Sequence, residues 1–175
     1  SEGVEIPESA KGLLERKQSE GMTSLLTTLD HRLLGIISIA DILRKGAKDA
    51  INKIREEGVS EIWMLTGDSA LVADRIGKEL GIGYEAKLLP EEKVMSVKEW
   101  KRKGRVVAMI GDGVNDAPAL AASDIGIAMG IRGPDAAKEA ADAVLADDNF
   151  VTIGQGIFEG RKFYDNLRKG VKYYL

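Results

Sequence analysis

The chain has 175 residues, enough for one domain of ordinary size, and 44% of them are hydrophobic. Its formal net charge of -3 gives no electrostatic reason to expect a nucleic-acid partner. It has no cysteine and one histidine, His31, which excludes disulfides and thiolate metal sites and argues against zinc chemistry. No run reaches the ~18–20 apolar residues that span a bilayer, so the chain itself is expected to be a soluble, cytosol-type protein.

The first forty residues predict a helix followed by a β-hairpin. The stretch 8–20 is thinly amphipathic, and Gly21 is its predicted stop. Two apolar runs rich in β-branched residues, MTSLLTTLD and LLGIISIAD, meet at Asp30-His31-Arg32, which suits a tight antiparallel turn. This opening is expected to form the edge of a mixed sheet.

From about residue 40, strands and helices alternate. The predicted helices cover 45–57, 70–80, 90–103, about 116–122 and 134–141. The predicted strands cover 61–66, 105–110, 124–129 and the short stretch AVLA. Alternation at this length predicts right-handed crossovers and a parallel sheet covered by helices on both faces. The final stretch, 150–175, has apolar residues at alternating spacings of three and four, which predicts one long amphipathic helix.

Two of the predicted strands end in polar, glycine-bearing turns, TGDS at 66–69 and GDGVND at 111–116. In parallel sheets, ligands bind outside the carboxyl ends of the strands. The threonine hydroxyl and glycine N–H of the first turn can donate to anionic oxygens. Asp112 offers the oxygen ligand that magnesium prefers, and Lys93 can neutralise phosphate charge. The pattern therefore predicts a site for a phosphate group and magnesium.

These motifs carry a resemblance to a known family. TGDS, then Lys93 in LPEEK, then GDGVNDAPAL resembles the phosphorylation domain of P-type cation-transporting ATPases, which belong to the haloacid dehalogenase superfamily. DIGIAMG, AAKEAADAVLADDNF and EGRKFYDNLRKGVKYY are similar to the rest of that domain and to the stalk helix that leads to the membrane. The stretch 41–44, DILR, resembles the hinge between the nucleotide and phosphorylation domains, although many pumps carry prolines after the aspartate. The resemblance covers essentially residues 22–175.

The resemblance implies a Rossmann-like, haloacid dehalogenase-type parallel sheet with flanking helices, an N-terminal β-hairpin remnant and a long C-terminal helix. Residues 1–39 would be the tail of the nucleotide-binding domain, 40–149 the phosphorylation domain core, and 150–175 a stalk-like amphipathic helix. The full-length protein would couple ATP hydrolysis, with Mg2+ and an aspartyl-phosphate, to cation transport at the cytoplasmic face of a membrane. Its partners would be ATP and the nucleotide, actuator and transmembrane parts of the same pump, and the transported cation would bind only to the full protein.

The family's functional residues carry over by motif. Three residues are implied to contact or stabilise the transferred phosphoryl group: Thr66, Gly67 and Lys93. Asp68 is implied to shape the loop of the first two. Asp112 is implied to bind magnesium, and Asn115 and Asp116 to complete the phosphate and magnesium shell, with Asp116 as a second metal ligand. Asp41 and Arg44 are implied to lie near the bound nucleotide.

One part of the family's site is not in this sequence. The family's nucleophile is an aspartate in an Asp-Lys-Thr-Gly-Thr stretch, which the chain does not contain. The site at 111–116 is therefore expected to be half of a site, and the chain alone to be inactive. In the family, the nucleophile's strand lies between the strands that end in TGDS and GDGVND. We expect strands 61–66 and 105–110 to pair directly, or another chain or the hairpin 22–39 to fill the gap.

Other interpretations stay open. The chain could be a soluble haloacid dehalogenase-type phosphatase, or a remnant that binds nucleotide or magnesium without catalysis. Residues 112–116 could be a solvated, helix-capping loop, and Asp41 and Arg44 a local ion pair. The basic cluster 101–105 is interpreted as a solvated face. The transported ion is also open, because VLADDNF and EGRKFYDN are similar to calcium, magnesium or proton pumps, whereas EAKLLPEEK is similar to the heavy-metal branch.

Overall fold

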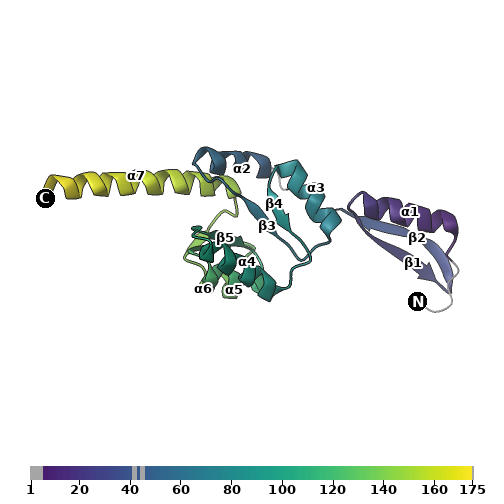
Figure 1. The fold of residues 1–175 in the computed structure, drawn as a ribbon. Coiled ribbons are helices and arrows are strands. Elements are labelled where there is room, and N and C mark those ends of the chain that lie inside the picture. The colour runs from purple at the N-terminus through teal and green to yellow at the C-terminus, as the bar shows by residue number, and fades with distance from the viewer. Residues whose placement is uncertain (1–5, 41–42, 44–45, 175) are drawn as a thin grey trace.

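The computed structural model describes residues 6–40, 43 and 46–174, so the predicted roles of Asp41 and Arg44 lie outside the described residues. Figure 1 shows an N-terminal unit, a larger α/β core and a helix that projects from the core. The N-terminal unit contains α1 (Glu8–Ser19), β1 (Thr23–Leu29) and β2 (Arg32–Ile39). The predicted helix and hairpin are therefore both present.

The hairpin is closed by a two-residue turn in the left-handed region. Asp30 has φ of 47° and His31 has φ of 62°, the signs that a tight hairpin turn of the type I′ family requires. β1 and β2 pair antiparallel with each other, and α1 packs against both. In the register, Leu26 faces Ile36 and is partly buried.

The core contains the rest of the elements. Its helices are α2 (Ala47–Glu56), α3 (Ala70–Leu80), α4 (Pro90–Arg102), the 3-10 turn η1 (Val114–Asp116), α5 (Ala117–Ala122), α6 (Asp135–Ala140) and α7 (Phe150–Tyr174). Its strands are β3 (Trp63–Leu65), β4 (Gly83–Glu85), β5 (Ala108–Gly111), β6 (Ile125–Met129) and β7 (Ala143–Leu145). The predicted alternation, parallel pairing and flanking helices are confirmed; β4 was not predicted.

The strands form two separate parallel sheets, β3-β4 and β5-β6-β7. Two of the expected ways of joining β3 to β5 are wrong: the two strands do not pair, and the hairpin pairs only with itself. The third, a strand from another chain, stays a prediction. The hairpin closes a very short loop, which costs less chain entropy than capture of a distant strand edge. β3 finds its partner in β4, and β3 and β5 are shorter than predicted, so each leaves few backbone groups unpaired along its open edge.

Two hydrophobic clusters hold the core together. The first contains Ile54, Met129, Leu145 and Ile153, and so joins α2, β6, β7 and the first half of α7. The second contains Leu120, Ala128 and Ala137, and joins α5 and α6 to β6. Burial of aliphatic side chains at this scale is the main favourable term in folding. The sheet β5-β6-β7 is thereby covered by helices.

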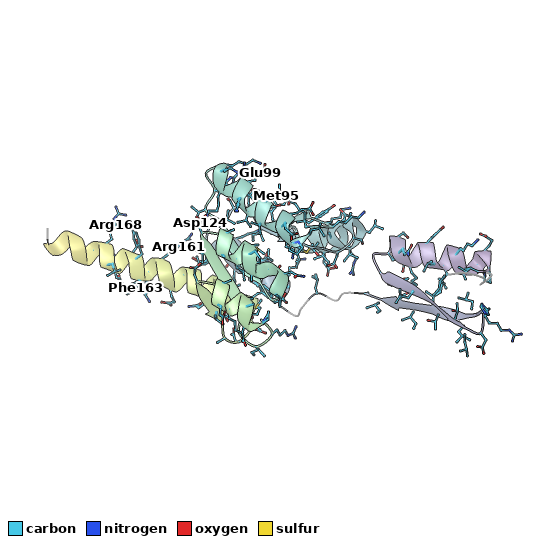
Figure 2. The ribbon with its side chains drawn as sticks, turned by 90° about the horizontal axis from the view of Figure 1, so that it is seen from below. Met95, Glu99, Asp124, Arg161, Phe163 and Arg168 are labelled. Carbon is cyan, nitrogen blue, oxygen red and sulfur yellow. The ribbon has the colours of Figure 1, made fainter. Side chains whose placement is uncertain are left out.

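Only the first half of α7 belongs to this core. The helix packs along α2, and its second half extends away from every other element in Figure 1. Figure 2 shows Phe163 and Arg168 on that second half, where Phe163 is 66% exposed. Within the described part of the chain, no helix combines the length and apolarity that crossing a membrane requires.

A tryptophan pair connects the small sheet to α4. The rings of Trp63 in β3 and Trp100 in α4 have centroids 5.7 Å apart and planes tilted by 42°, a favourable aromatic geometry. Trp63 is paired in register with Gly83, and a Cβ at Gly83 would lie only 2.6 Å from the Trp63 ring. Glycine at this position therefore lets the indole lie over β4 and reach α4.

We expect Gly83→Ala to displace Trp63 and to destabilise the protein by about 1–3 kcal/mol, as overpacked sites do. Trp63 and Trp100 are the only tryptophans in the chain, so fluorescence and near-ultraviolet circular dichroism report the pair directly. Gly35→Ala is the matched control, because nothing lies within 4 Å of a Cβ at Gly35. An unchanged tryptophan spectrum in Gly83→Ala would contradict the packing described.

Asp124 joins the beginning of β5 to the end of α4. Its carboxylate accepts a hydrogen bond from Val107 N at 2.9 Å and forms an ion pair with Lys101 Nζ at 3.1 Å. The backbone hydrogen bond and then Lys101 hold the pKa of Asp124 below its usual value, because both favour the charged carboxylate.

Because the folded-state pKa of Asp124 is lowered, its contribution to stability is present above the unfolded pKa and is lost as pH falls through the folded pKa. We therefore expect Asp124→Asn to destabilise the protein at neutral pH, and the difference from wild type to shrink below about pH 4. Urea unfolding from pH 3 to 7 measures this. The exposed Asp165→Asn in α7 is the control, and a difference that stays constant across this range would rule out the linkage.

Candidate functional site

The candidate site centres on a buried carboxylate. Asp116 is the one charged residue that is buried among the described residues. Its Oδ1 accepts from Lys93 Nζ at 2.8 Å, and its Oδ2 accepts from Gly113 N at 3.1 Å. The side chains of Lys93 and Asp116 are 15% and 12% exposed. Both carboxylate oxygens are therefore compensated, which a buried charge requires.

The turn after β5 is shaped by glycine. A Cβ at Gly111 would lie 2.6 Å from Cβ of Asp116, so only glycine lets Asp116 fold back against the end of the strand. Asp116 N donates to Gly113 O at 3.1 Å, which closes the single 3-10 turn η1. α5 follows at once, with Pro118 in its first turn, where a proline is tolerated.

The TGD loop after β3 is organised by its own side chains. Thr66 Oγ1 donates to Asp68 Oδ2 at 2.8 Å, and Asp68 N donates to Thr66 Oγ1 at 3.1 Å. Gly67, between them, is exposed, so its backbone is open to a ligand. Ser69 caps α3 by accepting from Val72 N at 3.4 Å.

The segment 85–88, which follows β4, holds this loop in place. Thr66 N donates to Glu85 O at 3.0 Å, Lys87 N donates to Asp68 O at 2.9 Å, and Leu88 N donates to Thr66 O at 3.0 Å. Lys87 has φ of 58°, which turns the chain from this segment into α4. The TGD loop and the beginning of α4 are therefore one connected piece of backbone.

α4 connects the TGD loop to the GDGVND turn at 111–116. Pro90 is at its first position, and Leu89 N donates to Glu92 Oε2 at 2.7 Å, so the first turn is capped. Lys93 lies in this turn and reaches Asp116, and α4 also packs against α5 and η1. A continuous series of contacts thus joins the TGD loop to the GDGVND turn, although their strands lie in different sheets.

The structure brings the predicted residues together in two groups. Lys93 and Asp116 form one contacting pair, and Thr66 and Asp68 form the other. Asp112 and Asn115 are exposed in the same turn as Asp116. No group of three or more acidic or histidine side chains suited to hold a metal ion is present in the described part of the chain. The exposed carboxylate of Asp112 has the hard oxygen chemistry that magnesium takes, so this side chain fits the ion.

Sequence reasoning missed two structural features, of which the first supports the site. One is β4 with the segment 85–88; its three residues, Gly-Tyr-Glu, form no apolar run, and the only signal was the β-forming Tyr84 after the stop at Gly81. The other is Asp148, whose carboxylate accepts from Ile131 N at 3.0 Å and Arg132 N at 2.9 Å. It holds the turn that follows β6, the strand paired with β5.

The basic cluster 101–105 is largely paired with carboxylates, as a solvated surface would be. Lys101 contacts Asp124, Lys103 Nζ lies 2.7 Å from Glu99 Oε1, and Arg105 pairs with Glu61. Charge that is already neutralised by neighbouring acidic groups leaves little to attract a phosphate backbone. The cluster therefore adds nothing to the candidate site.

Comparison with known proteins places this site in a family. A model described as haloacid dehalogenase-like hydrolase matches residues 4–124, and a second model with the same description matches residues 92–157. The chain belongs to the haloacid dehalogenase-like hydrolases. It is also homologous to the catalytic region of P-type ATPases, as its curated relatives and solved neighbours show.

Two curated relatives illustrate this homology. The chain is 44% identical over 150 residues to a zinc-exporting P-type ATPase of Mycobacterium marinum. The aligned residues cover 85% of this chain and 20% of that protein. It is 38% identical over 169 residues to a copper-exporting P-type ATPase of Staphylococcus aureus, covering 96% of this chain and 21% of that protein. The chain thus spans about a fifth of the length of the relatives it matches.

Solved structures support the same homology to P-type ATPases. A zinc-transporting PIB-type ATPase in the E2.Pi state matches with a TM-score of 0.82 and 41% identity, over 93% of this chain and 27% of that one. The catalytic domain of a CPx-ATPase matches with a TM-score of 0.59 and 37% identity, over 71% of this chain and 48% of that one. The predicted family and the haloacid dehalogenase-like fold are confirmed. The individual site residues stay predictions.

We expect Lys93→Met to destabilise the protein by about 3 kcal/mol, because it leaves the buried Asp116 carboxylate without its cation. The double variant Lys93→Met/Asp116→Asn should recover much of this loss, since the uncompensated charge is gone. Urea unfolding of the single and double variants measures the coupling. The control is Lys98→Met on the same helix, an exposed site expected to change stability by less than about 0.5 kcal/mol. Additive effects of the two site substitutions would show that the pair is not coupled.

Proposed function

We propose that the chain is part of the catalytic region of a P-type ATPase and supplies the phosphate-stabilising and magnesium-binding half of its phosphorylation site. The observation that carries this proposal is the contact between Lys93 and Asp116. This contact fixes the positively charged ammonium group of Lys93 beside the turn that bears Asp112. The homology to P-type ATPases along most of the chain supports it.

Each residue then has a part in phosphoryl transfer. The backbone N–H of Gly67 donates to an oxygen of the transferred group. The Thr66 hydroxyl, which donates to Asp68 in this structure, turns to donate to the same group when it is bound. Lys93 offsets the negative charge that is spread over the phosphoryl oxygens in the transition state. Because this charge stabilisation requires a fixed position, the ion pair to Asp116 also pre-organises Lys93.

The turn 111–116 is proposed to bind the metal. Asp112 is the proposed ligand of Mg2+, and Asn115 orients the phosphate oxygens. The metal, when bound, neutralises charge on the phosphate group and polarises its bonds. Asp116 as a further metal ligand remains a prediction, since both of its oxygens already have protein partners, Lys93 and Gly113.

The attacking carboxylate has to come from outside this sequence. We propose that it is carried by an Asp-Lys-Thr-Gly-Thr segment that adds a strand between β3 and β5. Both strands have a free edge for it among the described residues, because β3 pairs only with β4 and β5 pairs only with β6. Backbone hydrogen bonds along such an edge hold an added strand in register. That strand would unite the two sheets.

The remaining parts follow from the same proposal. Residues 1–39 form the tail of a nucleotide-binding domain that takes ATP, with Asp41 and Arg44 at its hinge; 40–149 form the phosphorylation core, and 150–175 a stalk that connects to transmembrane parts at the cytoplasmic face of a membrane. We also propose a transition-metal ion as the transported cation, because the relatives above are named zinc- and copper-exporting, and another is named manganese-exporting.

We expect the chain alone to form no acid-stable phosphoenzyme and to hydrolyse no ATP, because it has no attacking aspartate. Acid quenching after incubation with radiolabelled ATP and magnesium, followed by an acidic gel, measures this. A labelled band at 18.9 kDa that is lost at high pH or with hydroxylamine would show an acyl phosphate on this chain and overturn the half-site proposal.

The full-length protein provides the positive control. There, radiolabelled ATP should produce the acyl phosphate, and Asp112→Ala should abolish it, because the change removes an oxygen ligand from the metal. Asp165→Asn, on the exposed face of α7, should leave labelling unchanged. A phosphoenzyme of normal yield in Asp112→Ala would remove Asp112 from the magnesium site.

A further inference from the structure

One face of α4 carries a row of side chains that contact both sheets. Lys93, Ser96 and Trp100 recur at spacings of three and four, so they lie on the same face of the helix. Trp100 packs against Trp63 in β3, and Lys93 pairs with Asp116. Ser96 lies between these two contacts and makes a third one, with a carboxylate that has no role in the proposed function.

The partner of Ser96 is Glu85, the last residue of β4. Ser96 Oγ donates to Glu85 Oε2, and both residues are partly buried. The same hydroxyl lies 3.2 Å from the carbonyl oxygen of Glu92, one turn earlier in α4. The carboxylate is the stronger acceptor, because hydrogen bonds to charged groups are stronger than those to neutral ones. The hydroxyl therefore joins α4 to β4 and does more than bond back to its own helix.

Glu85 is also joined to the TGD loop, through its backbone. Its carbonyl oxygen accepts from Thr66 N at 3.0 Å, and Glu85 is paired in register with Leu65, the residue before Thr66. Its carboxylate holds α4 at a point three residues after Lys93. One residue thus contacts the TGD loop with its backbone and the helix that carries Lys93 with its side chain.

We propose that Glu85 is a positioning residue: through Ser96, its carboxylate fixes α4, and with it Lys93, relative to the TGD loop. The contacts themselves need no assumption about activity. Their consequence rests on the proposed function, in which Lys93 and the N–H of Gly67 contact the same phosphoryl group. Displacement of a catalytic group by about 1 Å can slow a reaction by about a hundredfold, so loss of this contact should slow phosphorylation.

The contact can be tested on the chain itself by NMR of the backbone amides. We expect Ser96→Ala and Glu85→Ala to shift the signals of Thr66 and Gly113 in the same direction, because both changes break the same hydrogen bond. Thr66 N and Gly113 N donate to other groups, so a shift at both shows that α4 has moved relative to both turns. The control is Glu99→Ala on the same helix, where the carboxylate pairs with a lysine at the surface. Unchanged signals of Thr66 and Gly113 in Ser96→Ala would overturn the positioning role.

The consequence can be tested on the full-length protein by the rate of phosphoenzyme formation. Glu85→Ala should lower the rate constant by at least about tenfold, both with ATP and with inorganic phosphate, because Lys93 acts on the transferred group in both reactions. The KM for ATP should stay within about twofold, since the change does not touch nucleotide binding. Glu85→Gln should recover most of the rate, because its amide oxygen still accepts from Ser96. Glu99→Ala should keep the native rate.

The dependence on Lys93 separates a positioning role from a general structural one. Lys93→Met should slow phosphorylation by itself, and adding Glu85→Ala should cause almost no further loss, since Glu85 acts through Lys93. Multiplied losses in the double variant, a native rate in Glu85→Ala, or a rate in Glu85→Gln as low as in Glu85→Ala would overturn the consequence. Failure of the native protein to form any phosphoenzyme would instead refute the proposed function, and the amide shifts would still decide whether the contact fixes α4.

Discussion

The contact between Lys93 and Asp116 is the constraint on which the rest of the site depends. It is a direct ionic link between η1, the turn that follows β5, and the beginning of α4, and it is nearly enclosed. An enclosed carboxylate is tolerated only when its charge is compensated, so the pair has to form whenever the core closes. Because α4 begins where the TGD loop is fastened by the segment 85–88, this one contact also places Thr66 and Gly67 relative to Asp112. The two sheets are thereby coupled without sharing a hydrogen bond between strands.

β3 and β5 do not pair with each other, and this feature is central to the proposed function. In a continuous parallel sheet, the strand ends would be aligned by backbone hydrogen bonds. Here they are aligned by helix packing, a tryptophan pair and an ion pair, which leave a free edge on each of the two strands. Under the proposed function, a strand that carries the attacking carboxylate could therefore enter without displacing any strand pairing among the described residues. Side-chain contacts thus hold the two polar turns in place, while one edge of β3 and one edge of β5 stay unpaired among the described residues.

The N-terminal unit is held together mainly by contacts within itself and makes few contacts with the core. Its hairpin is closed by a local turn and covered by α1, so it can form with few contacts to the rest. Such weakly attached units are the ones that change orientation in multidomain enzymes. The contact between Gly21 and Arg75 is small and therefore poorly suited to stabilise the fold. The large apolar clusters that do stabilise it lie around Ile54, Met129 and Leu120.

The sequence by itself determined the element types, the family and the residues of the two polar turns, because periodicity, glycine stops and the motifs TGDS and GDGVNDAPAL are local signals. It did not determine which strands pair. β4 has no apolar run, and the choice between β4, the hairpin and β5 as partners depends on loop closure and packing over the whole chain. It also did not show that Asp116 would turn away from solvent to Lys93, 23 positions earlier, since only tertiary structure sets burial and long-range contact. The motifs therefore indicated the candidate residues, and the packing of α4 against α5 decided which side chains meet.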